Sequence, residues 1–166
     1  MYENFFINVL CEVELIGTKV NALITRTTPR DVYDVYNLFK LKKDYDVNLI
    51  KKIAMFYITI GSDDRPIDFN NCIIKAINKI KKINFKTLKQ TLIPVLKKSE
   101  KIVAEEIADN VIEIITAIFK LTKEERDYID NFNKGIYEPN LLFKEYKIND
   151  ISTHPMAIWK MNCILN

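Results

Sequence analysis

Five charged residues near the start of the chain are of types that can act together on phosphate groups. Lys19, Arg26, Arg30, Asp31 and Asp34 fall within 16 consecutive residues. A lysine held beside an aspartate can anchor a phosphate while the carboxylate serves as a metal or base partner, which is what nucleotidyl transfer requires. By residue type and spacing, these five residues are therefore the candidates for a functional site.

The same residues also have a purely structural interpretation. Asp31 stands where an acid satisfies the first amides of a helix. Arg30 and Asp34 are four residues apart, so they can form a surface pair worth less than about 1 kcal/mol. Lys19 can lay its aliphatic stem along an apolar surface. Spacing alone leaves both interpretations open.

An antiparallel pair of helices is expected to position these five residues. Apolar spacing over residues 12–26 predicts a helix with Lys19 and Arg26 on one side. Thr28, Pro29 and Asp31 then form a start signal, with an N-cap, a proline at the first helical position and an acid three residues after the cap. The second helix should run to about Lys40 and return beside the first.

Helical periodicity continues through most of the chain. Apolar residues recur at spacings of three and four over residues 48–60, 73–80 and 103–118, which is typical of amphipathic helices. In the segment 48–60, Lys51 lies off the apolar stripe. A capping box at 122–125 predicts a helix to about residue 133, which Gly135 ends. His154-Pro155 precedes a last short helix. The prediction is an all-α, bundle-like domain of seven or eight helices covering residues 11–166.

One segment, Asn4 to Leu10, breaks this pattern. It is rich in aromatic and β-branched residues and too short for a confident helix, so we predict a strand. A lone strand cannot satisfy its own backbone groups, which makes it unusual in an all-α chain. We assign residues 1–10 to this strand and expect it to pair with a second copy or another chain.

The net charge of +3 is too small to indicate a partner, but the charge is unevenly distributed. Nine lysines and one glutamate give the stretch Lys75–Lys101 a charge of +8, which leaves −5 for the rest. Such a stretch could belong to a non-enzymatic helical module that contacts nucleic acid or an acidic partner. The residues proposed for nucleic-acid contact are Lys79, Lys81, Lys82, Lys86 and Lys89.

Other common functional signatures are absent from the sequence. It contains no GxGxxG, GxxxxGK[ST], HExxH or GxSxG motif, and the single histidine, His154, excludes a multi-histidine metal site. Cys11, Cys72 and Cys163 are far apart and odd in number, so we expect free, buried cysteines and a reducing compartment. Without a signal peptide or a long apolar run, the chain is predicted to be cytoplasmic and not membrane-bound.

The hairpin also carries a recognisable signature. Lys19-Val20-Asn21-Ala22-Leu23, Arg26 and Arg30-Asp31-Val32-Tyr33-Asp34-Val35-Tyr36 resemble the K-x-x-A-L…R…R-D-[LVI]-[YF]-D-[LVI]-Y signature of the nucleotidyltransferase AbiEii/AbiGii toxin family, the abortive-infection toxins of bacterial toxin–antitoxin systems. Two distal pieces fit as well, residues 121–143 and the closing His154-Pro155-Met156-Ala157-Ile158-Trp159-Lys160. Gly17 replaces the more usual Ala, which would let two helices approach closely.

The resemblance implies an enzyme of phage defence that transfers a nucleotide from an NTP to an acceptor such as RNA with Mg²⁺. By the family pattern Lys19 would touch the phosphates, Asp31 or Asp34 would complete the active-site carboxylates, and Arg30 would orient them. The resemblance thus implies Lys19, Asp31 and Asp34 as catalytic residues and Arg26 and Arg30 as nucleotide-binding residues, without a metal site of their own. The family's Gly-Ser segment and Asp-x-Asp pair precede the lysine by an α/β half-domain, but only 18 residues precede Lys19. Gly61-Ser62-Asp63-Asp64 follows the signature in a predicted turn, so we decline it as a substitute.

The expectation is therefore the helical C-terminal half of a truncated or split toxin. Residues 1–10 would then be the residual strand of the missing nucleotidyltransferase sheet. The chain should be inactive alone and bind neither Mg²⁺ nor NTP tightly. Its expected partners are an antitoxin or a separately encoded N-terminal half, and a second copy could pair with it through residues 4–10. The alternative function is a non-enzymatic helical module that contacts nucleic acid or an antitoxin through Lys75–Lys101.

Overall fold

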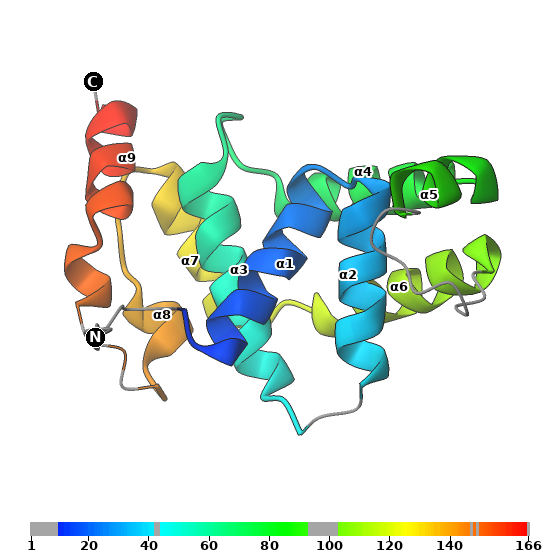
Figure 1. Ribbon diagram of the computed structural model, residues 1–166. Coiled ribbons are helices and arrows are strands. Elements are labelled where there is room, and N and C mark those ends of the chain that lie inside the picture. Colours follow the sequence, from blue (N-terminus) through cyan, green and yellow to red (C-terminus); the bar gives the residue numbers. More distant parts are fainter. Residues whose placement is uncertain (1–9, 42–43, 93–102, 147, 149, 166) are drawn as a thin grey trace, which may run out of the picture.

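The computed structural model describes residues 10–41, 44–92, 103–146, 148 and 150–165. This part of the chain is all-α, with nine α-helices and one 3₁₀ turn, and so confirms the predicted fold class (Figure 1). The helix count exceeds the predicted seven or eight partly because of α8, a single turn that periodicity cannot reveal. Residues 4–9 of the predicted strand lie outside the described residues, and the domain boundary at residue 10 stays a prediction.

The helices follow one another with short connections. The first four are α1 (Glu12–Thr25), α2 (Pro29–Lys40), α3 (Val47–Gly61) and α4 (Phe69–Ile80). Next come α5 (Phe85–Leu92), α6 (Ala104–Ile118) and α7 (Lys123–Asn133). The chain closes with α8 (Asn140–Phe143), the 3₁₀ turn (Ile151–Thr153) and α9 (Pro155–Leu165). No helix in the described ranges is long and apolar enough to cross a membrane.

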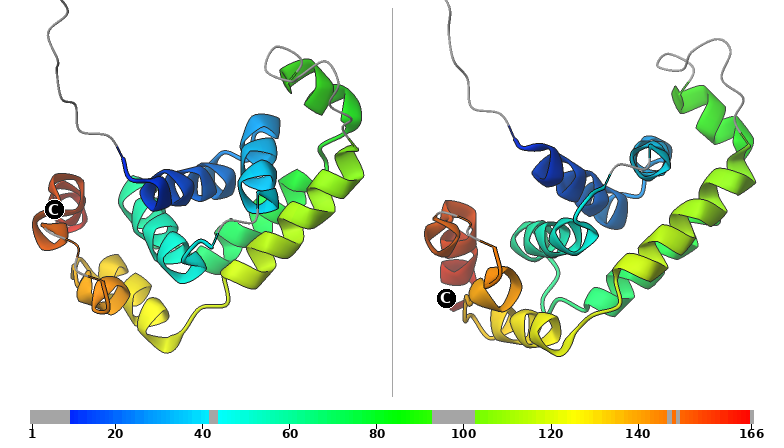
Figure 2. Two further views of the ribbon diagram at one scale, coloured as in Figure 1. Left: turned by 60° about the horizontal axis from the view of Figure 1, so that its bottom comes forward. Right: turned by 90° about the horizontal axis from the view of Figure 1, so that it is seen from below.

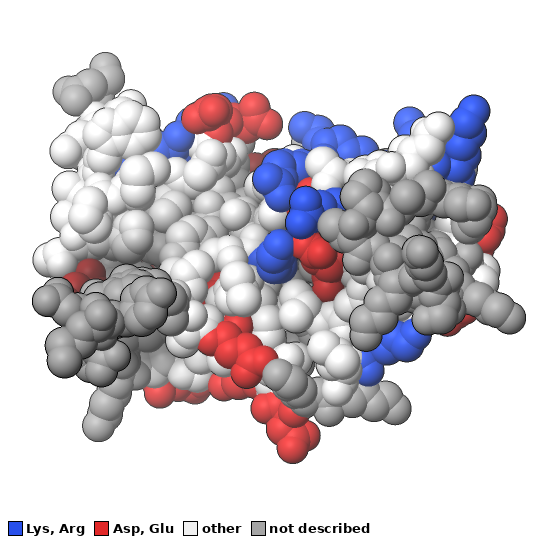
Figure 3. Space-filling model, viewed as in Figure 1, with Lys and Arg blue, Asp and Glu red and all other residues white. Residues whose placement is uncertain are grey.

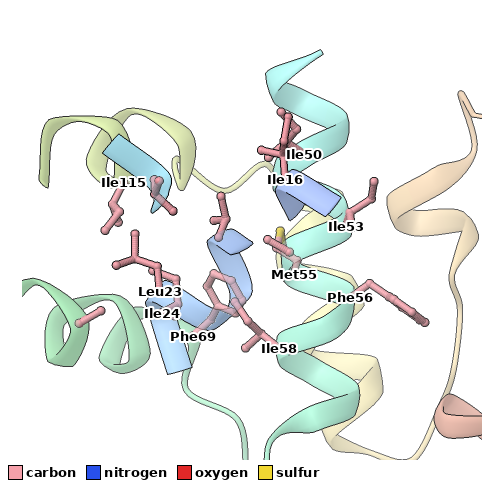
Figure 4. Packing of buried hydrophobic residues seen from close by; sticks show 14 of the residues in the cluster. Ile16, Leu23, Ile24, Ile50, Ile53, Met55, Phe56, Ile58, Phe69 and Ile115 are labelled. Carbon is pink, nitrogen blue, oxygen red and sulfur yellow. The ribbon is translucent and has the colours of Figure 1, made fainter. Parts of the chain in front are cut away.

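Helix α3 is the centre of the fold and has neighbours on two sides. It packs against α1 and α6 on one side and contacts α9 on the other, and the two further views show α7, α8 and α9 grouped at one end (Figure 2). Met55 and Ile58 face the cluster around α1, whereas Phe56 points the opposite way (Figure 4). There its ring meets Phe143 and His154 edge-on, with ring centroids 6.1 and 5.0 Å apart.

Helices α1 and α3 approach each other closely at Gly17. Gly17 is buried, and a Cβ at this position would lie 2.8 Å from the Cβ of Ile53. Gly17 does not have a positive φ, so its backbone conformation does not require glycine. The lack of space for a Cβ does. The expectation that Gly17 permits a close helix approach is confirmed.

Both predicted capping boxes are present. The side chain of Thr28 accepts from the amide of Asp31, and that of Thr122 accepts from the amide of Glu125. Each acid returns a hydrogen bond by accepting from the amide of its cap residue, at 3.0 and 2.8 Å. Gly135, with φ 80°, ends α7 as predicted.

Two predictions about buried residues are wrong. Cys11 and Cys163 are exposed and Cys72 is half-buried, although all three are free. Lys51, expected off the apolar stripe of α3, is buried. Its Nζ lies 2.7 Å from Oε1 of Glu125 on α7, and these side chains are 8% and 1% exposed. A carboxylate from a distant helix thus lets a lysine occupy the interior.

Candidate nucleotide-phosphate site

The turn between α1 and α2 sets the geometry of the candidate site. Helix α1 ends at Thr25, and Thr27 then adopts a left-handed conformation with φ 57°. Its hydroxyl donates to the carbonyl oxygen of Leu23 at 2.9 Å in a buried position, which holds this turn in place. Thr28 follows directly, and its capping box starts α2 at Pro29. The two helices therefore meet as the predicted antiparallel pair.

Lys19 and Asp34 connect the two helices. Nζ of Lys19 donates to Oδ2 of Asp34 at 2.7 Å, and both side chains are partly exposed. The sequence suggested that Asp34 would pair with Arg30 four residues earlier on its own helix. The carboxylate turns instead toward α1, so the pair spans the hairpin.

Arg26 and Asp31 form the second pair, beside the turn. Nη2 of Arg26 donates to Oδ1 of Asp31 at 2.6 Å, while Oδ2 accepts from the amide and the hydroxyl of Thr28. Burial of the 3% exposed carboxyl would by itself raise its pKa, but the hydrogen bonds from Arg26 and Thr28 outweigh that cost, so the pKa of Asp31 is lowered. The hydrogen bond to Asp31 also raises the pKa of Arg26.

All five predicted residues line one recess. Its volume is about 340 Å³, and its lining consists of Lys19, Arg26, Thr28, Arg30, Asp31 and Asp34. Basic side chains gather beside acidic ones at the centre of the face shown in Figure 3, over α1 and α2. Three cations against two carboxylates leave the recess one positive charge in excess. Thr28 was not predicted as a lining residue, although its capping signal was visible.

The donor set fits a phosphate better than a metal ion. Arg26 and Arg30 are exposed and Lys19 is partly exposed, so their donors can reach an anion. Both oxygens of Asp31 already accept hydrogen bonds. Among the residues that the structure describes, no three His, Cys, Asp or Glu side chains are grouped so as to hold a metal. The recess by itself therefore does not fit Mg²⁺.

Part of the lysine-rich stretch lies next to the recess. Nζ of Lys79 on α4 donates to the carbonyl oxygen of Arg26 at 3.4 Å. Sequence reasoning had no signal for this neighbourhood, because the two residues are 53 positions apart. Four other lysines, Lys75, Lys81, Lys82 and Lys86, are exposed as well, whereas the side chain of Lys89 lies outside the described part.

Comparison with known proteins agrees with the resemblance noted above. The family model described as nucleotidyl transferase AbiEii toxin, type IV toxin–antitoxin system, matches residues 2–110. Neither the curated proteins nor the solved structures contain a significant match. The matched range holds all five residues of the recess, and it spans about two thirds of the chain. The chain therefore belongs to the AbiEii family of nucleotidyl transferase toxins, a type IV toxin–antitoxin family, and this membership implies an antitoxin partner.

Proposed function

We propose that the α1–α2 recess binds the phosphates of a nucleotide in a nucleotidyl-transfer reaction, and that the chain needs a second protein part to catalyse it. One observation carries the proposal: three cations and two aspartates meet in one recess, and each aspartate is paired with a cation. In this assignment Lys19, Arg26 and Arg30 contact the phosphates of an NTP. Asp34 orients Lys19, and Asp31 orients Arg26.

The state of the two aspartates supports the need for a second part. Metal-assisted phosphoryl transfer uses carboxylates that hold Mg²⁺ between the attacking and leaving oxygens. Both carboxylate oxygens of Asp31 already accept hydrogen bonds, one from Arg26 and one from Thr28 at the cap of α2, and Asp34 accepts from Lys19. When bound, Mg²⁺ would neutralise charge on the phosphates, and we assign its ligands to the other part. The chain is then one portion of a truncated or split toxin that acts on an RNA acceptor in the cytoplasm of a bacterium, in phage defence.

An incorporation assay tests the catalytic half of the proposal. The purified chain is given labelled NTPs, Mg²⁺ and bulk tRNA, and the expected result is no labelled RNA. If the chain does incorporate label, and if Lys19→Ala or Asp34→Ala abolishes the incorporation, then the chain is active by itself. This result would refute the need for a partner.

A binding measurement tests the phosphate half. Inorganic triphosphate is titrated into the labelled chain while backbone amide resonances are followed by NMR. We expect weak, saturable binding with a dissociation constant of about 1 mM and shifts concentrated at residues 19–34. Lys19→Ala should weaken binding by about tenfold. Lys123→Ala, at an exposed lysine on α7, is the matched control; equal losses in both variants would contradict a specific site.

The second candidate function is contact with nucleic acid through the Lys75–Lys101 stretch. The hydrogen bond from Lys79 to the backbone of Arg26 favours it, because it brings one lysine of this stretch to the edge of the recess. Phosphate contacts release counterions, so affinity for a single-stranded RNA should fall steeply between low and moderate salt. Affinity that does not change with salt would contradict the idea.

The proposed function also includes assembly with another chain. Residues 4–10 are proposed to pair with a second copy or with a separately encoded N-terminal half. Measurement of the mass in solution, with and without residues 1–9, distinguishes a monomer from a dimer formed through this segment. A dimer that persists without the segment would reject this assignment.

A further inference from the structure

A second cationic pocket lies away from the α1–α2 recess. It has a volume of about 490 Å³ and is lined by residues of the α3–α4 loop, the end of α7 and α9, namely Asp63, Arg65, Pro66, Asn133, Lys160, Cys163 and Ile164. The C-terminal ends of α3 and α9 lie at the same edge of the molecule (Figure 1). None of these residues belongs to the recess, so the pocket does not depend on the proposed function.

Arg65 contributes a guanidinium group whose donors are incompletely used. Its Nη2 donates to the carbonyl oxygen of Thr59 at 3.4 Å, and its guanidinium carbon lies 5.4 Å from the ring centroid of Phe132. Nη1 is buried and has no hydrogen-bond partner among the described residues. A buried donor without an acceptor costs free energy, and in native proteins such a group commonly marks a bound water or ion.

Lys160 contributes an ammonium group that is poorly neutralised. Its side chain is only 9% exposed, and its Nζ lies 3.2 Å from Oδ1 of Asp63. The Asp63 side chain is fully exposed, at 101% of the reference value, so water competes for this carboxylate. Burial also lowers the pKa of Arg65, which reflects the cost of holding a cation there. Two cations thus share one weakly held carboxylate.

The ring of Trp159 lies beside Lys160, although Trp159 is not itself among the residues that line the pocket. Nζ of Lys160 lies 5.7 Å from the ring centroid of Trp159, and Trp159 is 55% exposed. Exposed aromatic rings next to cations are a common platform for nucleobases, because every base can stack on a ring while its phosphate meets the positive charge. The separation allows one nucleotide to contact both groups.

From these observations we infer that Arg65 and Lys160 form a second anion site that binds a phosphate group, with Trp159 beside it to stack a base when the phosphate belongs to a nucleotide. When no phosphate is bound, the Asp63 carboxylate pairs with the ammonium group of Lys160. A bound phosphate displaces this carboxylate. The ligand chemistry is a phosphate, whether as inorganic phosphate or as the phosphate of a nucleotide.

The fluorescence of Trp159, the only tryptophan in the sequence, provides the test. Adenosine 5′-monophosphate is titrated into the full chain, and inorganic phosphate is then added as a competitor. We expect saturable quenching with a dissociation constant of about 1 mM. If phosphate competes at equal affinity, the phosphate group alone accounts for binding. If it competes much more weakly, the base contributes and the ligand is a nucleotide.

Variants make the assignment specific. Lys160→Met keeps the buried stem and removes the charge, and should weaken binding by about tenfold. Lys144→Met, at an exposed lysine on the segment after α8, is the control and should bind normally. Asp63→Asn removes the competing carboxylate and should tighten binding several-fold, a gain that unfolding cannot produce. No quenching up to about 10 mM ligand, or an Asp63→Asn variant that binds no tighter, would overturn the inference.

Discussion

The close contact between α1 and α3 gives a prediction whose sign can be worked out from two glycines. An added Cβ at Gly17 would lie 2.8 Å from Cβ of Ile53 and 3.4 Å from the carbonyl oxygen of Ile50. Ile53 is buried and a backbone atom cannot rotate away, so Gly17→Ala must push the helices apart. Overpacking of this kind costs about 1–3 kcal/mol, whereas alanine favours a helix over glycine by about 1 kcal/mol. The difference is an expected net loss in the free energy of unfolding of about 0–2 kcal/mol, with about 1 kcal/mol at the centre of this range.

Gly61 at the end of α3 is the matched control. A Cβ there would meet no atom within 4 Å, so Gly61→Ala gains helix propensity without a clash. Urea unfolding followed by circular dichroism measures both variants. We expect Gly17→Ala to lower the midpoint and Gly61→Ala to leave it unchanged or raise it. If the two variants shift together, the contact between the helices is not what glycine serves at position 17.

The remaining predictions concern two buried carboxylates. Glu125→Gln should lower the free energy of unfolding by about 3 kcal/mol, because Lys51 would keep a buried charge without its partner, and adding Lys51→Met should recover most of the loss in the same urea assay. Asp31 has a pKa below the ordinary 3.8 in the folded chain, so its contribution to stability is present above that value and is lost as the pH falls through the lowered pKa. Asp31→Asn should therefore be less stable at neutral pH and lose less on acidification, and parallel acid profiles of the two proteins would contradict this.

Local signals predicted the framework of the candidate site well. The capping boxes at Thr28 and Thr122, the helix end at Gly135 and the antiparallel α1–α2 hairpin depend on residues close in sequence, and each is confirmed.

Partners that come from different helices could not be predicted in the same way. Asp34 was expected to pair along its own helix, but the hairpin brings Lys19 closer to it. Lys51 and Glu125 are 74 positions apart, and no periodicity indicates that one neutralises the other. The cysteines were placed by residue type alone, and type does not say which face of a helix turns outward. Sequence patterns thus predict contacts between residues close in the chain, whereas contacts between distant helices depend on how the helices pack.

The central position of α3 links the range matched by the family model to the rest of the chain. The family model ends at residue 110, inside α6, yet α3 relies on later segments for one whole side. Phe56 packs on Phe143 and His154, and the Thr59 hydroxyl lies 3.0 Å from that of Tyr128. Residues 2–110 by themselves would leave these groups of α3 in water. A fragment limited to the matched range would therefore lose the packing that α7 to α9 give to one side of α3.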